Sequence, residues 1–206
     1  RGRWASFMKI SPNIFVIAYS GLDDDGYIET YNISNDGKTI KRIKDFEHDK
    51  SQGTYNSLHR VDWNTYVLAY AGSSNDGYLK TFDIPLDGSD IKQVKSHEHD
   101  GWNGHHNSMT ELSPNYFVNT NYGYQRYNGS WTGYGGWIKT FKVSNSGNIS
   151  RLQHTRFENN VTHYHSIVKI DEDSYALSYQ MNNVGYLQTF TIPADGSSIT
   201  SESKQY

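Results

Sequence analysis

Apolar and polar side chains alternate along most short segments of this chain. In residues 78–84, Tyr-Leu-Lys-Thr-Phe-Asp-Ile, one face carries Tyr, Lys, Phe and Ile while the other carries Leu, Thr and Asp. A period of two, with many aromatic and β-branched residues, predicts β-strands. No segment keeps the 3.6-residue period of a helix over a useful length, so we expect an all-β chain.

One alternating block recurs four times. It reads D-G-Y-I-E-T-Y, D-G-Y-L-K-T-F, G-G-W-I-K-T-F and V-G-Y-L-Q-T-F, and successive copies of its aromatic residue lie 51, 59 and 49 residues apart. Each copy stands among three further short segments. Turns in which Gly follows Asp or Ser separate the third and fourth segments, as expected for hairpins, at residues 35–37, 86–88, 145–147 and 194–196.

Four short strands in a unit of about 50 residues predict the blade of a β-propeller. We therefore expect one repeat domain, 1–206, with four repeats of about 51 residues. Its four-stranded antiparallel blades should span about 4–47, 48–99, 100–158 and 159–206. A β-solenoid would have much shorter coils, and isolated sheets would leave apolar residues uncovered on both faces.

Composition narrows the range of partners. The chain has 206 residues, no cysteine and a formal net charge of −3. Disulfides and cysteine-based metal sites are therefore excluded, and the absence of a basic block makes nucleic acid an unexpected partner. No apolar run approaches the ~18 residues that a membrane span needs. The chain does not start with Met and shows no signal peptide, so we expect a processed product or a fragment.

Three motifs together resemble a known kind of protein. The D-G-Y-[I/L]-x-T-F block, the D-G-x-x-I turn and the E-H-D linkers at 47–49 and 98–100 resemble tandem-repeat β-propeller proteins of exported, cell-surface type. The resemblance covers nearly the whole chain. It implies the fold and an extracellular or cell-surface location, but no specific chemistry, and the third and fourth copies depart from D-G-Y and E-H-D.

The chain begins and ends at the same phase of its repeat. Three interpretations remain open: a ring closed by blades one and four, part of a longer array, or copies of the chain stacked on one another. In the last case the outer strand at 199–206 would be free to pair with a neighbour, which predicts self-association.

The linkers between predicted blades collect the histidines, since seven of the nine lie in or beside them. Aligned residues should surround the mouth of the central channel, where aromatic rings could stack on sugar rings and polar groups could bind hydroxyls. An aromatic insertion in the third copy adds to this surface. The predicted ligand-binding residues are Trp4, Tyr55, Trp102, His106, Tyr164, His165, Tyr124, Tyr127 and Trp131. Alternatively, the aromatics of the insertion pack over a blade edge or against another subunit.

Metal and catalytic chemistry have weaker signals. His105, His163 and Asp100 could bind zinc, although no ligand motif appears and capping of strand ends is the favoured role for these histidines. Asp residues at 23–25 could bind calcium, although Asp before Gly is first a turn signal; no other cofactor is expected. Tyr164 with His106 could abstract a proton in a polysaccharide lyase. Glu47 and Glu98 could in principle serve in glycoside hydrolysis, but their repetition at aligned positions indicates a structural role in each blade.

Four N-x-S/T sequons predict glycosylation at exposed sites: Asn32, Asn128, Asn148 and Asn160. The main functional expectation is an exported, non-enzymatic β-propeller that binds carbohydrate or partner surfaces in adhesion. The first alternative is a self-assembling, glycosylated structural subunit of an extracellular fibre or oligomer. The second is a polysaccharide lyase or hydrolase.

Overall fold

The computed structural model describes residues 2–127 and 130–206, with the side chains of 125–132 outside the description. It contains four antiparallel four-stranded sheets, each ordered as in the sequence. We call them blades 1 to 4. Blade 1 comprises β1 (Arg3–Ser11), β2 (Ile14–Ser20), β3 (Gly26–Ile33) and β4 (Ile40–Asp49); blade 2 comprises β5 (Thr54–Arg60), β6 (Thr65–Ala71), β7 (Gly77–Asp83) and β8 (Lys92–Asp100).

The second half repeats the plan. Blade 3 comprises β9 (His105–Ser113), β10 (Tyr116–Tyr127), β11 (Ser130–Val143) and β12 (Ile149–Glu158); blade 4 comprises β13 (His163–Asp171), β14 (Ser174–Met181), β15 (Val184–Thr191) and β16 (Thr200–Gln205). The all-β propeller architecture predicted from the repeat is therefore confirmed. Short 3-10 turns join the second and third strands of the first two blades, at η1 (Leu22–Asp24) and η2 (Ser73–Asn75).

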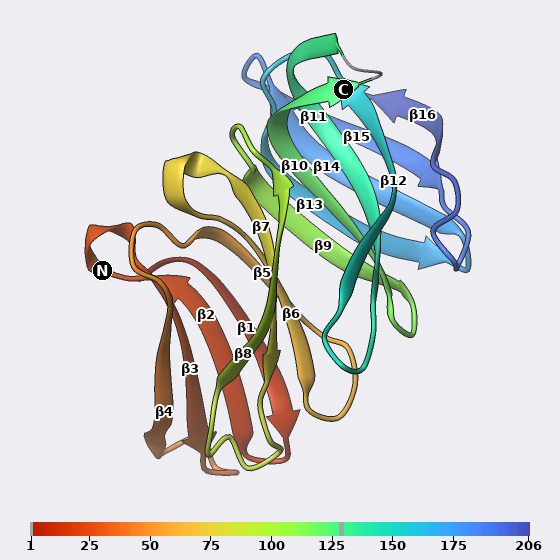
Figure 1. The fold of residues 1–206 in the computed structure, drawn as a ribbon. Helices are drawn as coiled ribbons and strands as arrows, with labels where there is room; N and C mark the ends of the chain where they lie inside the picture. Colours follow the sequence, from red (N-terminus) through yellow and green to blue (C-terminus); the bar gives the residue numbers. More distant parts are fainter. Residues whose placement is uncertain (1, 128–129) are drawn as a thin grey trace.

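The blades stand in a row, face against face. Figure 1 shows blade 1 at one end and blade 4 at the other, and the four sheets do not close into a ring. The first strands β1, β5, β9 and β13 lie innermost, where the first strands of neighbouring blades contact one another. We call the side of a blade that faces the preceding blade its front face, and the other its back face.

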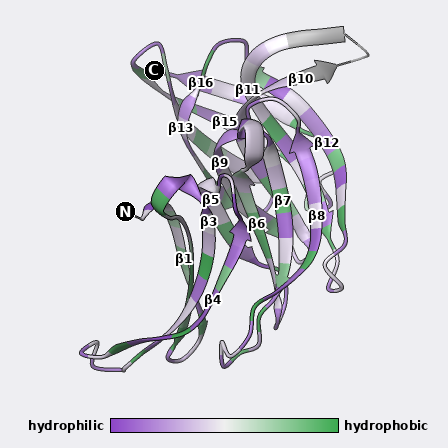
Figure 2. Ribbon diagram, turned by 60° about the vertical axis from the view of Figure 1, so that its left-hand side comes forward, coloured by the Kyte–Doolittle hydropathy of each residue, from purple (hydrophilic) through white to green (hydrophobic). Residues whose placement is uncertain are grey.

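The core lies between the blades rather than within any one of them. In blade 2, Phe82 of β7 and Ile84 just after it pack forward against blade 1, whereas Leu79 of β7 packs backward against blade 3. This is the period of two that the sequence shows, and Figure 2 shows the same alternation as bands of colour along the strands. Equivalent layers join blades 1 to 2, 2 to 3 and 3 to 4.

At the end of each of the first three blades, a histidine or phenylalanine ring packs against a glycine of the same blade. His48 and His99 cover the glycines of the D-G-Y blocks in blades 1 and 2, and Phe157 does so in blade 3. A methyl group on Gly77 would lie 2.5 Å from Cε1 of His99, which is too close for any real contact. Glycine is thus required where linker and strand approach each other.

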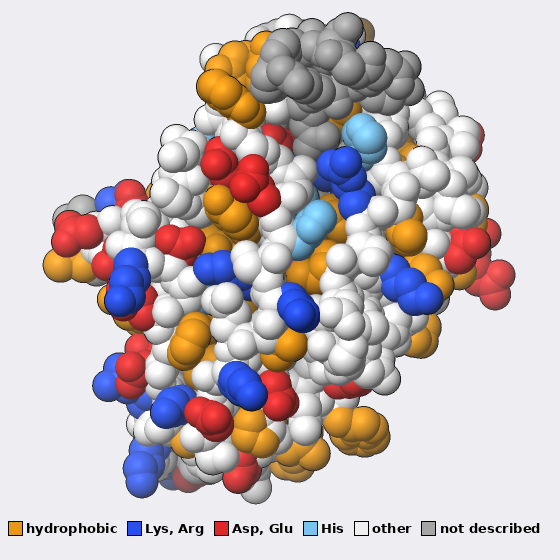
Figure 3. Space-filling view, in the orientation of Figure 1, with side chains coloured by type: hydrophobic (Ala, Val, Ile, Leu, Met, Phe, Trp, Pro, Cys, Tyr) orange, Lys and Arg blue, Asp and Glu red, His pale blue; other side chains and the backbone are white. Residues whose placement is uncertain are grey.

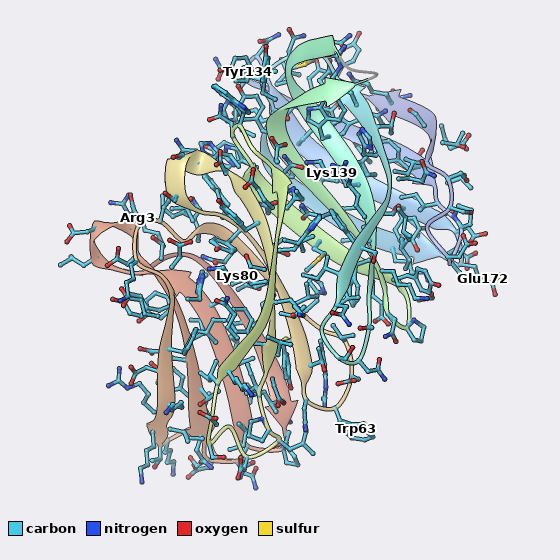
Figure 4. The ribbon with its side chains drawn as sticks, in the orientation of Figure 1. Arg3, Trp63, Lys80, Tyr134, Lys139 and Glu172 are labelled. Carbon is cyan, nitrogen blue, oxygen red and sulfur yellow. The ribbon has the colours of Figure 1, made fainter. Side chains whose placement is uncertain are left out.

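A carboxylate in each linker ties it to the following blade. Asp49 accepts a hydrogen bond from the Tyr70 hydroxyl at 2.9 Å, and Glu158 accepts one from Tyr179 at 3.3 Å. The tie in the middle is fully buried: Lys139 Nζ lies 3.0 Å from Asp100 Oδ2. Burial lowers the pKa of Lys139 to about 8 even though the charge of Asp100 opposes that shift. Figure 4 shows Lys139, like its counterpart Lys80, within the molecule.

We expect Gly77→Ala to destabilise the protein by roughly 1–3 kcal/mol, because the new methyl group must displace the His99 ring. Gly185 is the matched control: it occupies the same repeat position in blade 4, but a methyl group there meets nothing within 4 Å. Gly185→Ala should change the free energy of unfolding by less than about 0.5 kcal/mol. Urea unfolding of both variants measures the difference, and equal losses would contradict this packing.

His48 should make the protein sensitive to acid. Burial lowers its pKa to about 3, whereas an unfolded histidine has a pKa of about 6.5. Below pH 6.5 the unfolded chain takes up the proton first, so this contribution to stability is lost as the pH falls from 6.5 towards 3. His48→Phe, which copies the ring of Phe157, should reduce the stability lost between pH 7 and pH 5 by about 2 kcal/mol.

The reciprocal variant Phe157→His provides the control, because it places an additional buried imidazole at the same repeat position. It should steepen the loss of stability over the same pH range. Urea unfolding at several pH values measures both effects. An unchanged pH dependence in His48→Phe would show that His48 takes up its proton over the same pH range in the folded protein as in the unfolded chain.

Candidate functional site

A bulge in the first strand of every blade directs one bulky side chain towards the corresponding side chains of the neighbouring blades. The strand register shifts just before the serine that begins each regular pairing. The residues at this bulge have left-handed backbone, with φ of 47°, 56°, 56° and 54° at Trp4, Tyr55, His106 and Tyr164. Such a conformation costs roughly 1–2 kcal/mol per non-glycine residue, and bulges are known to redirect side chains next to functional sites.

These four rings form a continuous series across the blades. The ring centroids of Trp4 and Tyr55 lie 4.9 Å apart, those of Tyr55 and His106 4.3 Å, and those of His106 and Tyr164 5.4 Å. Together with the residue that follows each of them they line a hollow of about 260 Å³, which we call the mouth cleft. The structure therefore brings together the aligned residues that were predicted to surround the mouth of the channel. Their role in binding stays a prediction.

Two histidines from neighbouring blades meet beside the mouth cleft. His163 Nδ1 lies 3.0 Å from His106 Nε2, and the His105 ring packs on Tyr55 at 5.1 Å. Burial, followed by the nearby His163 and His105, lowers the pKa of His106 to about 3. His106 is therefore neutral at physiological pH.

The tautomers of this pair determine what it can do. A neutral imidazole has one N–H donor and one acceptor nitrogen. Whichever ring donates across the 3.0 Å contact, its second nitrogen is left as an acceptor. His163 is partly exposed whereas His106 is buried. Burial therefore disfavours a charged His106 ring, and the His163 ring is the more accessible of the two.

The other polar residues of the mouth cleft hold the linkers in place. The Asn56 and Asn107 amides donate to the carbonyls of Gly53 at 2.7 Å and Gly104 at 2.6 Å. His165 Nε2 lies 2.8 Å from the Thr162 hydroxyl, and burial lowers the pKa of His165 to about 3. These groups shape the wall of the cleft.

The insertion of the third copy lengthens β10 and β11 into a hairpin that carries an aromatic strip. Tyr124 lies 4.9 Å from Tyr134 and 6.3 Å from Trp102, measured between ring centroids. The strip continues through Tyr122, stacked on Tyr134 at 5.8 Å, to His163 at 6.4 Å. Tyr122 and Tyr134 belong to the insertion predicted to add to the binding surface but were not named among the binding residues, and the register of the hairpin places both on this strip. The predicted residues Tyr127 and Trp131 have side chains outside the description.

The candidate metal ligands are placed in different surroundings. His105 and His163 lie near the mouth cleft, whereas the Asp100 carboxylate is buried in its ion pair with Lys139. Among the described residues, no group of three or more His, Asp or Glu side chains is arranged to hold a metal ion. Asp residues 23–25 form and follow the η1 turn, whose backbone is left-handed at two of them. Zinc and calcium binding stay predictions.

The remaining predicted sites lie on the surface. Asn32, Asn148 and Asn160 are exposed, and Asn128 lies outside the described residues. The outer strand β16 is exposed along its whole length and pairs with β15. Figure 3 shows acidic and basic side chains interspersed on one face of the molecule. Within the described residues, no helix is both long and apolar enough to cross a membrane.

Comparisons with known proteins establish the fold. No protein-family model and no curated protein matches the sequence. Among solved structures, a hypothetical selenium-binding protein from Sulfolobus tokodaii is 10% identical, with a TM-score of 0.63 over 96% of this chain and 53% of that one. A candidate 6-phosphogluconolactonase from Bacteroides fragilis is 11% identical, with a TM-score of 0.53 over 97% of this chain and 70% of that one.

A periplasmic gluconolactonase from Pseudomonas aeruginosa is 12% identical, with a TM-score of 0.49 over 94% of this chain and 69% of that one. The two matches with TM-scores of 0.63 and 0.53 confirm the propeller part of the resemblance seen in the sequence. The chain spans about half the length of the Sulfolobus protein that it matches.

The comparisons correct the main functional expectation. We expected a non-enzymatic protein for adhesion, but the same fold occurs in a protein named for the hydrolysis of a sugar lactone. The alternative of a hydrolase is therefore better supported than the non-enzymatic reading. The sequence misled here because aromatic and polar residues around a channel are common to sugar-binding surfaces and to enzyme clefts.

Proposed function

We propose that the chain is a hydrolase that cleaves an ester bond, such as that of a lactone, in a sugar-derived substrate. The observation that carries this proposal is the contact between His163 and His106 beside an aromatic-walled cleft. A histidine held by a second group through Nδ1 is the usual arrangement of a general base.

The chemistry of the cleft favours an ester over a glycosidic bond. A glycosidase of the common kind needs two carboxyl groups on either side of the bond that it cleaves. None of the described residues that line the mouth cleft is Asp or Glu. An ester carbonyl, by contrast, is open to attack by a water molecule whose proton a single imidazole accepts.

His163 Nε2 takes a proton from water as the water oxygen forms a bond to the carbonyl carbon. The ester C–O bond then breaks, and the imidazolium returns the proton to the departing alkoxide oxygen, which leaves a carboxylic acid and an alcohol. His106 acts as a positioning residue: it stays neutral and accepts the Nδ1–H of His163.

The aromatic residues would hold the sugar part of the substrate. Tyr55 and Tyr164 present rings at the mouth cleft, and Tyr164 is 71% exposed. Rings of this kind offer the apolar platform that small-molecule sites use, with a few polar groups for orientation. The Bacteroides protein is named for a sugar lactone, which belongs to this class of substrate.

One observation favours a second candidate, a lyase. The Tyr164 and His106 rings lie 5.4 Å apart, so a tyrosine hydroxyl and an imidazole could share the removal of a proton beside a carboxyl group. Such a reaction needs the Tyr164 hydroxyl, whereas the hydrolysis proposed above does not. The two candidates are therefore distinguished by one variant.

We expect the protein to accelerate the hydrolysis of glucono-1,5-lactone, followed as acid release at constant pH. His163→Gln should lower kcat by roughly 100- to 10,000-fold, because the general base is lost. His106→Gln should also lower kcat and shift its pH profile, because the positioning of His163 changes. Tyr164→Phe should leave kcat within about twofold.

His59→Gln serves as the control for the loss of a histidine away from the mouth cleft, with circular dichroism to confirm that each variant is folded. A folded protein that accelerates neither lactone nor aryl-ester hydrolysis would refute the proposal. Formation of unsaturated, ultraviolet-absorbing sugar products, lost in Tyr164→Phe, would establish the lyase in its place.

We also propose that the protein is exported, as the resemblance seen in its sequence implies. Glycans on Asn32, Asn148 or Asn160 would support passage through a secretory route, because all three side chains are exposed.

A further inference from the structure

The two ends of the row expose apolar residues that are buried everywhere else in the repeat. On the front face of blade 1, Phe7 is 55% exposed, whereas its equivalents Leu58, Met109 and Ile167 are 3–4% exposed. Other residues of this front face, such as Phe15, are likewise only partly covered. The front face of blade 1 therefore has the composition of a core layer and lacks its covering blade.

The back face of blade 4 shows the same contrast. Leu187 is 51% exposed, whereas its equivalents Ile28, Leu79 and Ile138 are fully buried. Ile170 on β13 is 60% exposed and adds to the same face. Inside the chain, each buried front face packs against the back face of the preceding blade. The two open faces, the front of blade 1 and the back of blade 4, are therefore of the two kinds that pack together.

A repeated hydrogen bond also lacks one member of its series. The hydroxyls of Thr30, Thr81 and Thr140 on the back faces donate to the carbonyl of the turn glycine in the next blade, at 2.7, 2.8 and 2.7 Å. The fourth threonine, Thr189, has no such glycine ahead of it and reaches only Ser203 O at 3.5 Å. The remaining turn glycine is Gly37 of blade 1, where an added methyl group would meet nothing within 4 Å.

A second series ends in the same way. The hydroxyls of Ser6, Ser57 and Ser108 each accept a hydrogen bond from a backbone N–H in the first strand of the next blade, at 3.0–3.1 Å. The fourth member of the series is Ser166 in blade 4, and the N–H in the equivalent position at the other end is that of Phe7. Both series therefore predict the same register between blade 4 and blade 1.

We infer that two copies of the chain join head to tail, with the back face of blade 4 of each copy packed on the front face of blade 1 of the other. In this register Thr189 donates to Gly37 O of the partner subunit, and Ser166 accepts from the N–H of the partner's Phe7. The occupant of each open face is thus a second copy, because the chain itself carries the matching face.

The number of copies is argued from the four blades that the structure describes. A head-to-tail interface produces a ring when its rotations close and an open filament when they do not. Two copies supply eight blades, within the range of about 4–8 that propellers use. The inference does not depend on the proposed hydrolase activity, although the ring would place the partner's Trp4 beside Tyr164 and complete the series of rings at the mouth.

The test is the mass of the native protein by sedimentation velocity and native mass spectrometry across micromolar concentrations. We expect a species of twice 23.6 kDa. Leu187→Lys and Phe7→Lys should each raise the dissociation constant by roughly 100-fold or more, because every dimer would bury the unpaired lysine at both interfaces. Both variants should remain folded, since these positions are exposed in a single copy.

Leu22→Lys is the matched control, because Leu22 is 71% exposed but lies in η1, away from both faces. It should leave the dimer unchanged. A wild-type protein of 23.6 kDa at all concentrations, or an open series of larger species, would overturn the inference. So would a dimer that both lysine variants leave intact, because it would have to form elsewhere, for example along β16.

Discussion

A four-stranded sheet with apolar residues on both faces can bury them only against other sheets, and this constraint organises the whole molecule. Each of the three core layers belongs to two blades at once. The hydroxyl of a threonine such as Thr81, bonded to Gly147 of the next blade, fixes the register of each layer. Apolar burial supplies most of the stabilising free energy of such layers, and these polar ties make the packing specific.

The mouth cleft follows from this stacking. Because the blades repeat, the same bulge in every first strand brings one side chain from each blade to the mouth cleft. Divergence between copies then decides the chemistry. The position is aromatic at Trp4, Tyr55 and Tyr164, and it is a neutral histidine only at His106, where His163 of the next blade reaches it. A backbone feature common to all blades thus brings two histidines into contact at the junction of blades 3 and 4.

The linkers show how a repeated acid can be structural. From the sequence we expected such a role for Glu47 and Glu98, but the structure places the ties on Asp49, Asp100 and Glu158. The buried Lys139–Asp100 pair costs desolvation free energy on both sides, which its 3.0 Å contact offsets. The Asp100 carboxylate therefore serves to join blade 2 to blade 3.

Patterns in the sequence predicted the four units, their strands, the hairpin turns and the positions that meet at the mouth. These features are local or periodic, so alternation and turn residues are enough to predict them. Only the tertiary structure brought His163 to His106, placed Tyr122 and Tyr134 on the aromatic strip, and left Phe7 and Leu187 exposed. Those outcomes depend on strand register and on which blade is a neighbour, and neither is encoded in the spacing of residues along one strand.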